Sequence, residues 1–377
     1  MSVNPLRHLA SRGQSIWLDD LHRGLIESGE LDRLIREDGV AGLTSNPAIL
    51  AQALRGRAEY REAVRAARGR RESAQAIFEA LAIADVRSAA DSFRPVYEAT
   101  GAQDGYVSME VSPLLADDAP GTSAEARALW QRIGRPNVMI KVPATPAGLE
   151  AIPDLLVAGI NLNVTLLFSV RRHAAVIEGF FDALEVRLRR GEPLQGVASV
   201  ASFFVSRIDT LVDARLDAVG TTVATALRGT TAIACAKLAY QEYLRGLKTQ
   251  RWMQLAALGA QPQRLLWASV STKDRAYHDL KYVEPLIAPD TIVTMPIATL
   301  AAFRDHGRPS VGIDDDLEGV RAVGSRLAPL GIRLDDLARE LLTDGVRRFV
   351  ASHDRLLAAL ARYAMDITKG GLTRGHP

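Results

Sequence analysis

Short apolar runs recur along the chain, and each is followed by polar, Gly or Pro residues and then by a helical pattern. Eight runs are rich in β-branched and aromatic residues, at 15–19, 39–44, 105–111, 137–143, 159–168, 196–205, 264–270 and 291–296. Near-continuous apolar strands that alternate with helices predict a parallel sheet covered by helices. Eight such units favour an α/β fold, a closed (β/α)8 TIM barrel with additional helices, over an open doubly wound sheet.

The additional helices are expected in the two longest connections, at about 47–104 and 208–262, which exceed the usual length of a loop. A further helical region is predicted at 335–363, where Gly345 is expected to break or bend the helix.

Helix starts are also readable in the sequence. Thr122 and Glu125 have the spacing of a capping box, in which a hydroxyl and a carboxylate satisfy free backbone N–H groups. Thr145 before Pro146 has the pattern of an N-cap and first helical residue, and Ser169 is placed to cap a long amphipathic helix.

Composition is that of an ordinary globular protein, with 377 residues, 47% hydrophobic and 24% charged. We expect one domain over residues 1–377, with the barrel at about 14–365 and a disordered tail at about 369–377. A net charge of +2 argues against a dedicated nucleic-acid or membrane-surface protein. A homo-oligomer is compatible with the sequence, which does not decide the oligomeric state.

Cys235 is the only cysteine, so an intrachain disulfide is excluded and a cysteine-based metal cluster is implausible. The N-terminus carries no apolar core of signal-peptide length, and no apolar run approaches the length of a membrane span. We therefore expect a cytoplasmic location.

Lys141 is the most informative residue, because it lies within the apolar run 137–143 directly before a predicted helix. Burial disfavours the charged ammonium, and a partly neutral lysine is a nucleophile toward carbonyl carbons. The alternative is a strand-end lysine whose stem packs while its ammonium reaches water.

Polar residues concentrate at the carboxyl ends of the predicted strands, where the catalytic groups of such barrels lie. These residues are Asp19, Thr44, Ser45, Asn46, Glu110, Lys141, Asn163, Thr165, Ser199, Ser202 and Ser269. Singly, Asp19 or Asn46 could cap a helix and Thr165 could be an ordinary strand residue. Together, a lysine and two carboxylates supply the nucleophile and the proton carriers of Schiff-base chemistry, in which the iminium is the electron sink and no metal is needed.

Six segments of the sequence resemble those of transaldolase, specifically its longer bacterial type. They are 14-QSIWLDDL-21, 42-GLTSNPAIL-50, 108-SMEVSP-113, 139-MIKVPATPAG-148, 160-INLNVTLLFS-169 and 198-ASVASFFVSRID-209. The resemblance runs from about residue 10 to about residue 360, and the ordered set of motifs is highly specific.

The resemblance implies a role for each site residue. Lys141 matches the Schiff-base lysine, and Asp19 the acid/base that deprotonates the C4 hydroxyl. Glu110 matches the carboxylate that moves protons through a bound water and Thr165. The implied substrate-binding residues are Thr44, Asn46, Asn163, Ser202, Phe204, Arg207, Ser269 and Lys273.

The phosphate-binding part departs from the better-known short type. The segment 269-SVSTKD-274 carries Ser271 where that type has an arginine, with Lys273 nearby. Lys273 is therefore expected to supply the second positive charge for the phosphate, as a point charge.

The implied activity is that of the pentose phosphate pathway enzyme. A dihydroxyacetone unit passes from sedoheptulose 7-phosphate or fructose 6-phosphate to glyceraldehyde 3-phosphate or erythrose 4-phosphate, with no cofactor. The nearest alternative is an aldolase that releases free dihydroxyacetone, but similar aldolases carry a glutamine at the position of Glu110.

Two alternatives come from other classes. A metal-dependent isomerase or hydrolase would need a cluster of His, Asp and Glu ligands, and none of the seven histidines ends a predicted strand. A catalytically inactive barrel that only binds a ligand is disfavoured, because all three charged catalytic positions are present.

Overall fold

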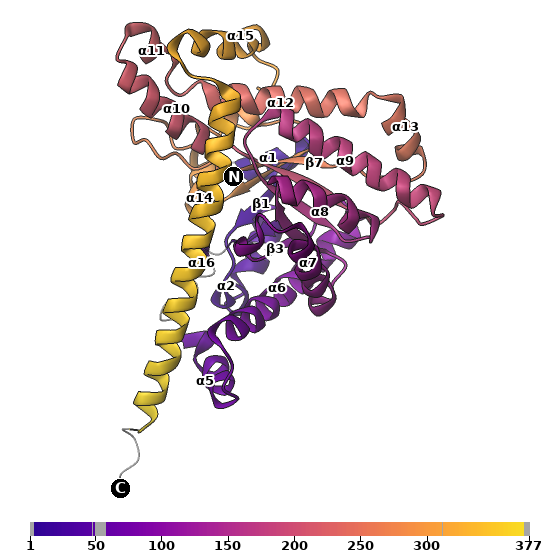
Figure 1. The fold of residues 1–377 in the computed structure, drawn as a ribbon, viewed down its shortest axis with the longest axis vertical. Coiled ribbons are helices and arrows are strands. Elements are labelled where there is room, and N and C mark those ends of the chain that lie inside the picture. Colours follow the sequence, from indigo (N-terminus) through magenta and orange to yellow (C-terminus); the bar gives the residue numbers. More distant parts are fainter. Residues whose placement is uncertain (1–3, 47, 50–57, 311, 373–377) are drawn as a thin grey trace.

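The computed structural model describes residues 4–46, 48–49, 58–310 and 312–372 (Figure 1). Its centre is a closed barrel of eight parallel strands in sequence order. The strands are β1 (Gln14–Asp19), β2 (Val40–Thr44), β3 (Tyr106–Glu110), β4 (Val138–Pro143), β5 (Leu162–Leu167), β6 (Ser199–Phe204), β7 (Arg264–Ala268) and β8 (Thr291–Met295). The predicted (β/α)8 TIM barrel is confirmed, and each predicted apolar run overlaps one strand.

Helices surround the barrel, and further helices occupy both long connections, as predicted. The helices that precede β4 are α1 (Pro5–Ser11), α2 (Arg23–Glu27), α3 (Glu30–Arg33), the π-helix η1 (Leu34–Asp38), η2 (Ala58–Tyr60), α5 (Arg61–Gly69), α6 (Ala74–Ala99), η3 (Pro113–Leu115) and α7 (Ala119–Ile133). Then follow α8 (Pro146–Val157), α9 (Val170–Arg189), α10 (Ser206–Val219), α11 (Thr222–Leu227), α12 (Thr231–Leu247), α13 (Gln250–Ala257), η4 (Glu284–Leu286), α14 (Ile297–His306), α15 (Leu317–Leu327), η5 (Ala328–Leu330) and α16 (Leu334–Leu372). Residues 47 and 50–57 of the first connection lie outside the described part.

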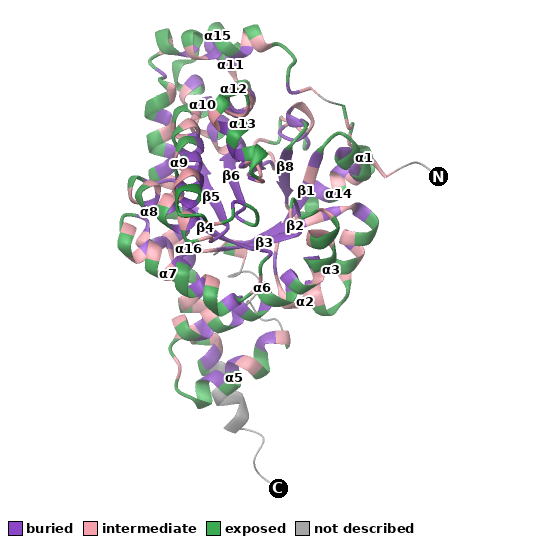
Figure 2. Ribbon diagram, turned by 90° about the vertical axis from the view of Figure 1, so that its right-hand side faces the viewer, coloured by how far each residue is buried: buried purple, intermediate pink, exposed green. Residues whose placement is uncertain are grey.

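The barrel wall is buried on both faces, which explains why its strands read as apolar runs. Every residue of β4, β5, β6 and β8 is buried, and Figure 2 shows the strands as the buried centre within a ring of half-exposed helices. A Cβ built on Gly42 of β2 would lie 2.5 Å from the Trp17 ring of β1, so the glycine makes room for that indole.

α16 differs from its prediction, because it is continuous over 39 residues and is not broken at Gly345. A Cβ on Gly345 would lie 3.0 Å from Leu166 Cδ2, so this glycine allows the helix to approach β5 closely. The helix extends to Leu372, into the predicted tail at about 369–377, and residues 373–377 lie outside the described part. α16 packs against α10 as well as α5 and α6, and so crosses the carboxyl-end face of the barrel.

Two of the predicted helix caps are confirmed, because Thr145 and Ser169 accept N–H bonds at the starts of α8 and α9. The capping box of Thr122 and Glu125 is wrong. α7 begins earlier, with the side chain of Asp118 as its N-cap. The Thr122 hydroxyl instead donates to the Leu115 carbonyl, and Glu125 accepts from the Ser112 N–H.

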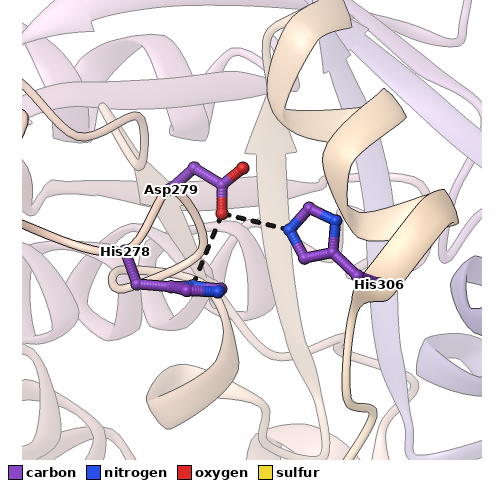
Figure 3. Close-up of side chains that lie close together, drawn as sticks. All are labelled: His278, Asp279 and His306. Carbon is purple, nitrogen blue, oxygen red and sulfur yellow. Dashed lines mark hydrogen bonds and ion pairs between the residues drawn. The ribbon is translucent and has the colours of Figure 1, made fainter.

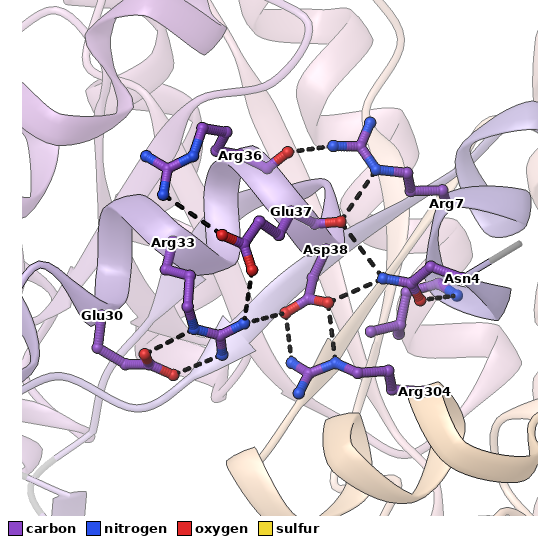
Figure 4. A network of polar contacts seen from close by, with 9 residues as sticks. Asn4, Arg7, Glu30, Arg33, Arg36, Glu37, Asp38 and Arg304 are labelled. Carbon is purple, nitrogen blue, oxygen red and sulfur yellow. Dashed lines mark hydrogen bonds and ion pairs between the residues drawn. The ribbon is translucent and has the colours of Figure 1, made fainter. Parts of the chain in front are cut away.

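A polar network around the buried Asp38 joins α1, η1 and α14 at the amino-terminal side of the barrel (Figure 4). Asp38 accepts hydrogen bonds from Asn4 at 2.9 Å and from Arg304 Nε at 2.8 Å, and Arg33 lies 3.6 Å away. This face lies opposite the carboxyl ends of the strands, so we assign the network to stability. Within the described residues, no helix is both long and apolar enough to cross a membrane.

Candidate active site

A cavity of about 690 Å³ opens at the carboxyl ends of the strands. Its polar and aromatic lining consists of Asp19, Thr44, Asn46, Lys141, Thr165, Ser202, Phe204, Arg207, Ser269, Ser271, Lys273, Thr294 and Phe349. Ser199 is the first residue of β6, at the opposite end of the strand from the cavity, so its assignment to the site was wrong. The Ser45 side chain does not line the cavity, although the Ser45 carbonyl accepts a hydrogen bond from Lys141. All the other predicted site residues except Glu110 and Asn163 are brought together here. These two lie in the barrel wall directly beside Lys141, because the strand register pairs Glu110 of β3 with Lys141 of β4 and Lys141 with Asn163 of β5.

The Lys141 side chain is 6% exposed, and its ammonium makes two polar contacts with the protein. Nζ donates to the Ser45 carbonyl at 3.1 Å and lies 3.7 Å from Glu110 Oε2. The 3.7 Å separation is too long for a hydrogen bond, so the carboxylate balances the lysine charge without fixing the position of Nζ.

Asp19, at the end of β1, reaches the cavity beside Thr44 of β2, its partner in the strand register. Thr44 Oγ1 donates to Asp19 Oδ1 at 2.9 Å and lies 2.7 Å from Thr294 Oγ1 of β8. Burial raises the pKa of the Asp19 carboxyl, while the charge of Lys141 and the Thr44 hydrogen bond act in the opposite direction. This carboxylate is held in place and is a stronger base than one in water.

The Glu110 side chain is only 5% exposed, and burial raises its pKa, again opposed by the charge of Lys141. Glu110 Oε2 is buried and accepts no hydrogen bond from the described residues, and the same is true of the Thr165 hydroxyl. A buried polar atom without a partner is costly and needs an explanation, of which a catalytic role is one.

A chain of buried hydrogen bonds links β3, β5 and β6. Ser202 Oγ donates to Asn163 Oδ1 at 2.6 Å, and Asn163 Nδ2 donates to Ser108 Oγ at 3.1 Å. These contacts fix which way the Asn163 amide points. Ser108 was missed by sequence reasoning, although its position two residues before Glu110 places both side chains on one face of β3.

Arg207 lies in the first turn of α10, at the side of the cavity. Its guanidinium carbon is 5.4 Å from the Phe204 ring centre and 6.0 Å from that of Phe349, within range of a cation–π contact. Its Nη1 is buried without a hydrogen-bond partner among the described residues, and burial lowers the pKa of the guanidinium. The aromatic rings thus contact a guanidinium whose Nη1 donates to no described residue.

The segment after β7 completes this side of the cavity. Lys273 Nζ donates to Ser271 Oγ at 2.8 Å, and Ser269 Oγ lies 3.1 Å from Ser206 Oγ. Burial, together with the charge of Arg207, lowers the pKa of Lys273. Two cations and two hydroxyl-bearing residues therefore face one part of the cavity, which suits a phosphate group.

The sequence profile of the family described as Transaldolase/Fructose-6-phosphate aldolase matches residues 16–360. The chain belongs to this family. The transaldolase of Frankia alni is 47% identical over 360 residues, which cover 95% of this chain and 97% of that protein. That of Thiobacillus denitrificans is 46% identical over 95% of this chain and its own full length, and transaldolase 2 of Nostoc punctiforme is 43% identical over 96% and 97%.

In this member of the transaldolase family, Asn46 both caps a turn and lines the cavity. Its Oδ1 accepts from the backbone N–H groups of Ala48 and Ile49 at 3.0 and 3.1 Å, so it does cap the following turn, as the sequence allowed. It lines the cavity as well, and no hydrogen bond joins its Nδ2 donor to another described residue.

Metal-ligating side chains do gather once in the described part of the chain, but away from the cavity. His278, Asp279 and His306 lie at the surface, with Asp279 Oδ1 3.4 Å from His278 Nδ1 and 3.1 Å from His306 Nε2 (Figure 3). None of the three lines the cavity around Lys141.

Three further cavity residues were missed by sequence reasoning. Thr294 is the second-last residue of β8 and could have been found by the rule that selected the other strand ends. Ser271 was named only as a departure from the short type. Phe349 comes from the middle of α16, where nothing in a helical pattern indicates contact with the site.

Proposed function

We propose that this chain is a transaldolase, which transfers a dihydroxyacetone unit from sedoheptulose 7-phosphate or fructose 6-phosphate to glyceraldehyde 3-phosphate or erythrose 4-phosphate. The observation that carries the proposal is the buried Lys141 ammonium, 3.7 Å from Glu110 and in one cavity with Asp19. The relatives of 43–47% identity that bear the name transaldolase support it.

Schiff-base formation is assigned to Lys141, Glu110 and Thr165. The neutral lysine amine attacks the C2 carbonyl carbon, and the resulting carbinolamine loses its hydroxyl as water, which leaves an iminium. Glu110 donates the proton that the leaving hydroxyl needs, relayed by a water and the Thr165 hydroxyl. The raised pKa of Glu110 supports this role, because a carboxyl that keeps its proton closer to neutral pH is a better general acid.

Carbon–carbon cleavage is assigned to Asp19. Its carboxylate takes the proton of the C4 hydroxyl, the C3–C4 bond breaks, and the bonding electron pair moves into the iminium to give an enamine. The first aldose leaves, and C3 of the enamine attacks the aldehyde carbon of the acceptor while Asp19 returns the proton to the new hydroxyl. Water then hydrolyses the iminium and frees Lys141.

The remaining residues hold the substrate. The fixed side chains of Asn163 and Ser202, with Asn46 and Thr44, are proposed to bind the hydroxyls of the three-carbon unit. Arg207, Lys273 and Ser269 are proposed to bind the phosphate, and the Phe204 ring to support Arg207. A ketose phosphate has its carbonyl and its phosphate at opposite ends, which matches a lysine and an arginine on different sides of one cavity.

The first test is chemical trapping. Borohydride added with fructose 6-phosphate should reduce the iminium and attach the sugar to Lys141, as read by peptide mapping. Lys237 is an internal control, because it is also buried but donates to the carbonyls of Gly312 and Asp315. An unmodified Lys141, or equal labelling of the two lysines, would refute the mechanism.

The second test separates transferase from aldolase. With fructose 6-phosphate, glyceraldehyde 3-phosphate release is measured with and without erythrose 4-phosphate. A transferase requires the acceptor for sustained turnover, whereas an aldolase releases dihydroxyacetone without it. Steady turnover without acceptor would refute the transferase and show that the protein is an aldolase.

Sugar phosphates are the proposed binding partners. A cytoplasmic location remains a prediction, and so does a possible homo-oligomer. Cys235 is buried and unpaired, as a reducing compartment would allow. Fractionation of cells would test the location, and light scattering would measure the oligomeric state.

A further inference from the structure

A second and wider cavity, of about 1650 Å³, lies between α10 and α16. Arg207 and Lys273 line both this outer cavity and the inner cavity that contains Lys141. The two cations therefore stand at the boundary between the two spaces. A ligand whose phosphate lies against Arg207 presents the outer face of that phosphate to the wall formed by α16.

The α16 wall of the outer cavity is positively charged. Arg347 and Arg348 both pair with the carboxylate of Asp344, which can balance only one of the two guanidinium groups. No carboxylate of the described residues lies within ion-pair distance of Arg207 or Lys273. The cavity thus has an excess of positive charge that its own acids do not compensate.

Arg348 is the α16 cation best placed to act together with Arg207. It is four residues from Asp344 and precedes Phe349, whose ring contacts the Arg207 guanidinium from the inner cavity. Arg348 and Arg207 line the same outer cavity, and after burial the charge of Arg348 is the largest cause that lowers the pKa of Arg207. Two like charges held together in this way are relieved by an anion between them.

We propose that Arg348 is a second phosphate-binding residue, which closes on the outer face of the sugar phosphate while Arg207 holds the inner face. The inference rests on the proposed function. A phosphate monoester carries a charge of about −1.5 to −2 at pH 7 and three acceptor oxygens, so two arginine forks suit it better than one. The charged outer cavity also attracts the substrate from solution.

The test compares Arg348→Gln with Arg347→Gln as a matched control. Both variants remove one guanidinium from α16 and one partner of Asp344. With fructose 6-phosphate, we expect KM to rise about tenfold for Arg348→Gln, the usual effect of losing a charged hydrogen bond, with little change in kcat. We expect less than about a twofold rise for Arg347→Gln, because a screened charge at the surface contributes little. Equal effects of the two variants, or an unchanged KM for Arg348→Gln, would overturn the proposal.

Two further measurements separate this inference from the proposed function. Inorganic phosphate should bind the intact protein by calorimetry, and Arg348→Gln should weaken that binding by a similar factor, whether or not the protein turns over a sugar. Borohydride trapping of unphosphorylated dihydroxyacetone on Lys141 should be equal in the wild type and both variants. Failure to trap it in the wild type counts against the proposed function, whereas phosphate binding equal in all three proteins counts against Arg348.

Discussion

Replacing Asp209 by asparagine should stabilise the protein near neutral pH. Asp209 lies in the first turn of α10, two residues after Arg207, and is 1% exposed. Its Oδ1 accepts from the Ala232 N–H at the start of α12 at 2.7 Å, and its Oδ2 accepts from the Tyr282 hydroxyl at 3.1 Å. Burial raises the pKa of the carboxyl from 3.8 to about 6, more than these two hydrogen bonds lower it.

The size and sign of the effect follow from this shift. Below about pH 4 both the folded and the unfolded state keep the proton, so burial of Asp209 carries no ionic cost. Between about pH 4 and 6 the unfolded chain ionises first, so stability falls as pH rises. A shift of about two pKa units lowers the free energy of unfolding by about 3 kcal/mol, and this loss is complete above the folded-state pKa of about 6. Asparagine resembles the protonated carboxyl, since its Oδ1 still accepts from Ala232 and its Nδ2 donates to the Tyr282 oxygen.

Urea unfolding of wild type and Asp209→Asn from pH 4.5 to pH 8 measures the difference. We expect the variant to be more stable by about 3 kcal/mol at pH 8 and the gain to shrink steadily on acidification. Asp217→Asn is the control, because Asp217 is exposed on the same helix and pairs with Arg228 at the surface. A variant that is less stable than wild type at pH 8, or a gain that does not depend on pH, would refute the reasoning.

Three other substitutions test the site and its supports. Asp19→Ala should still form the borohydride adduct on Lys141 but cleave fructose 6-phosphate about 10²–10⁴-fold more slowly in single-turnover assays; loss of the adduct would reassign Asp19. Gly148→Ala puts a Cβ 1.9 Å from the Pro143 carbonyl oxygen, so we expect a loss of about 1–3 kcal/mol in urea unfolding and a lower kcat; unchanged stability would contradict this contact. Asp38→Ala should lower the free energy of unfolding by about 2 kcal/mol, a modest loss because its arginine partners are partly exposed and regain contact with water. KM should not change, and a changed KM would show that Asp38 takes part in function.

The barrel was predictable from the sequence because strands buried on both faces must be apolar throughout, and that pattern is local. The position of the site could be predicted from the barrel, since parallel strands bring their carboxyl ends to one face. Glu110, Lys141 and Asn163 are close because they share a register, which the sequence does not state but the predicted sheet implies.

The features that sequence reasoning missed depend on contacts between distant segments. Glycine often ends a helix, but Gly345 instead lets α16 pack closely on Leu166, which is almost 180 positions earlier in the chain. Phe349 reaches the inner cavity, and Arg348 the outer one, only because α16 crosses the barrel face between α10 and α6. A helical periodicity shows which side of α16 is apolar, but not what that side covers.

The two carboxylates near Lys141 can be told apart by their surroundings, which matters because the proposed mechanism gives them opposite tasks. Asp19 receives a hydrogen bond from Thr44 that stabilises its ionised form, whereas Glu110 Oε2 receives none from the described residues. Burial raises the pKa of both groups, and the charge of Lys141 opposes burial in both. When the lysine amine becomes neutral to attack a carbonyl, that opposing charge is lost, and the carboxylate with the weaker remaining support takes a proton more readily. Glu110 is that group, so in the proposed mechanism the same event that makes Lys141 a nucleophile prepares Glu110 as the acid for dehydration and leaves Asp19 as the base for cleavage.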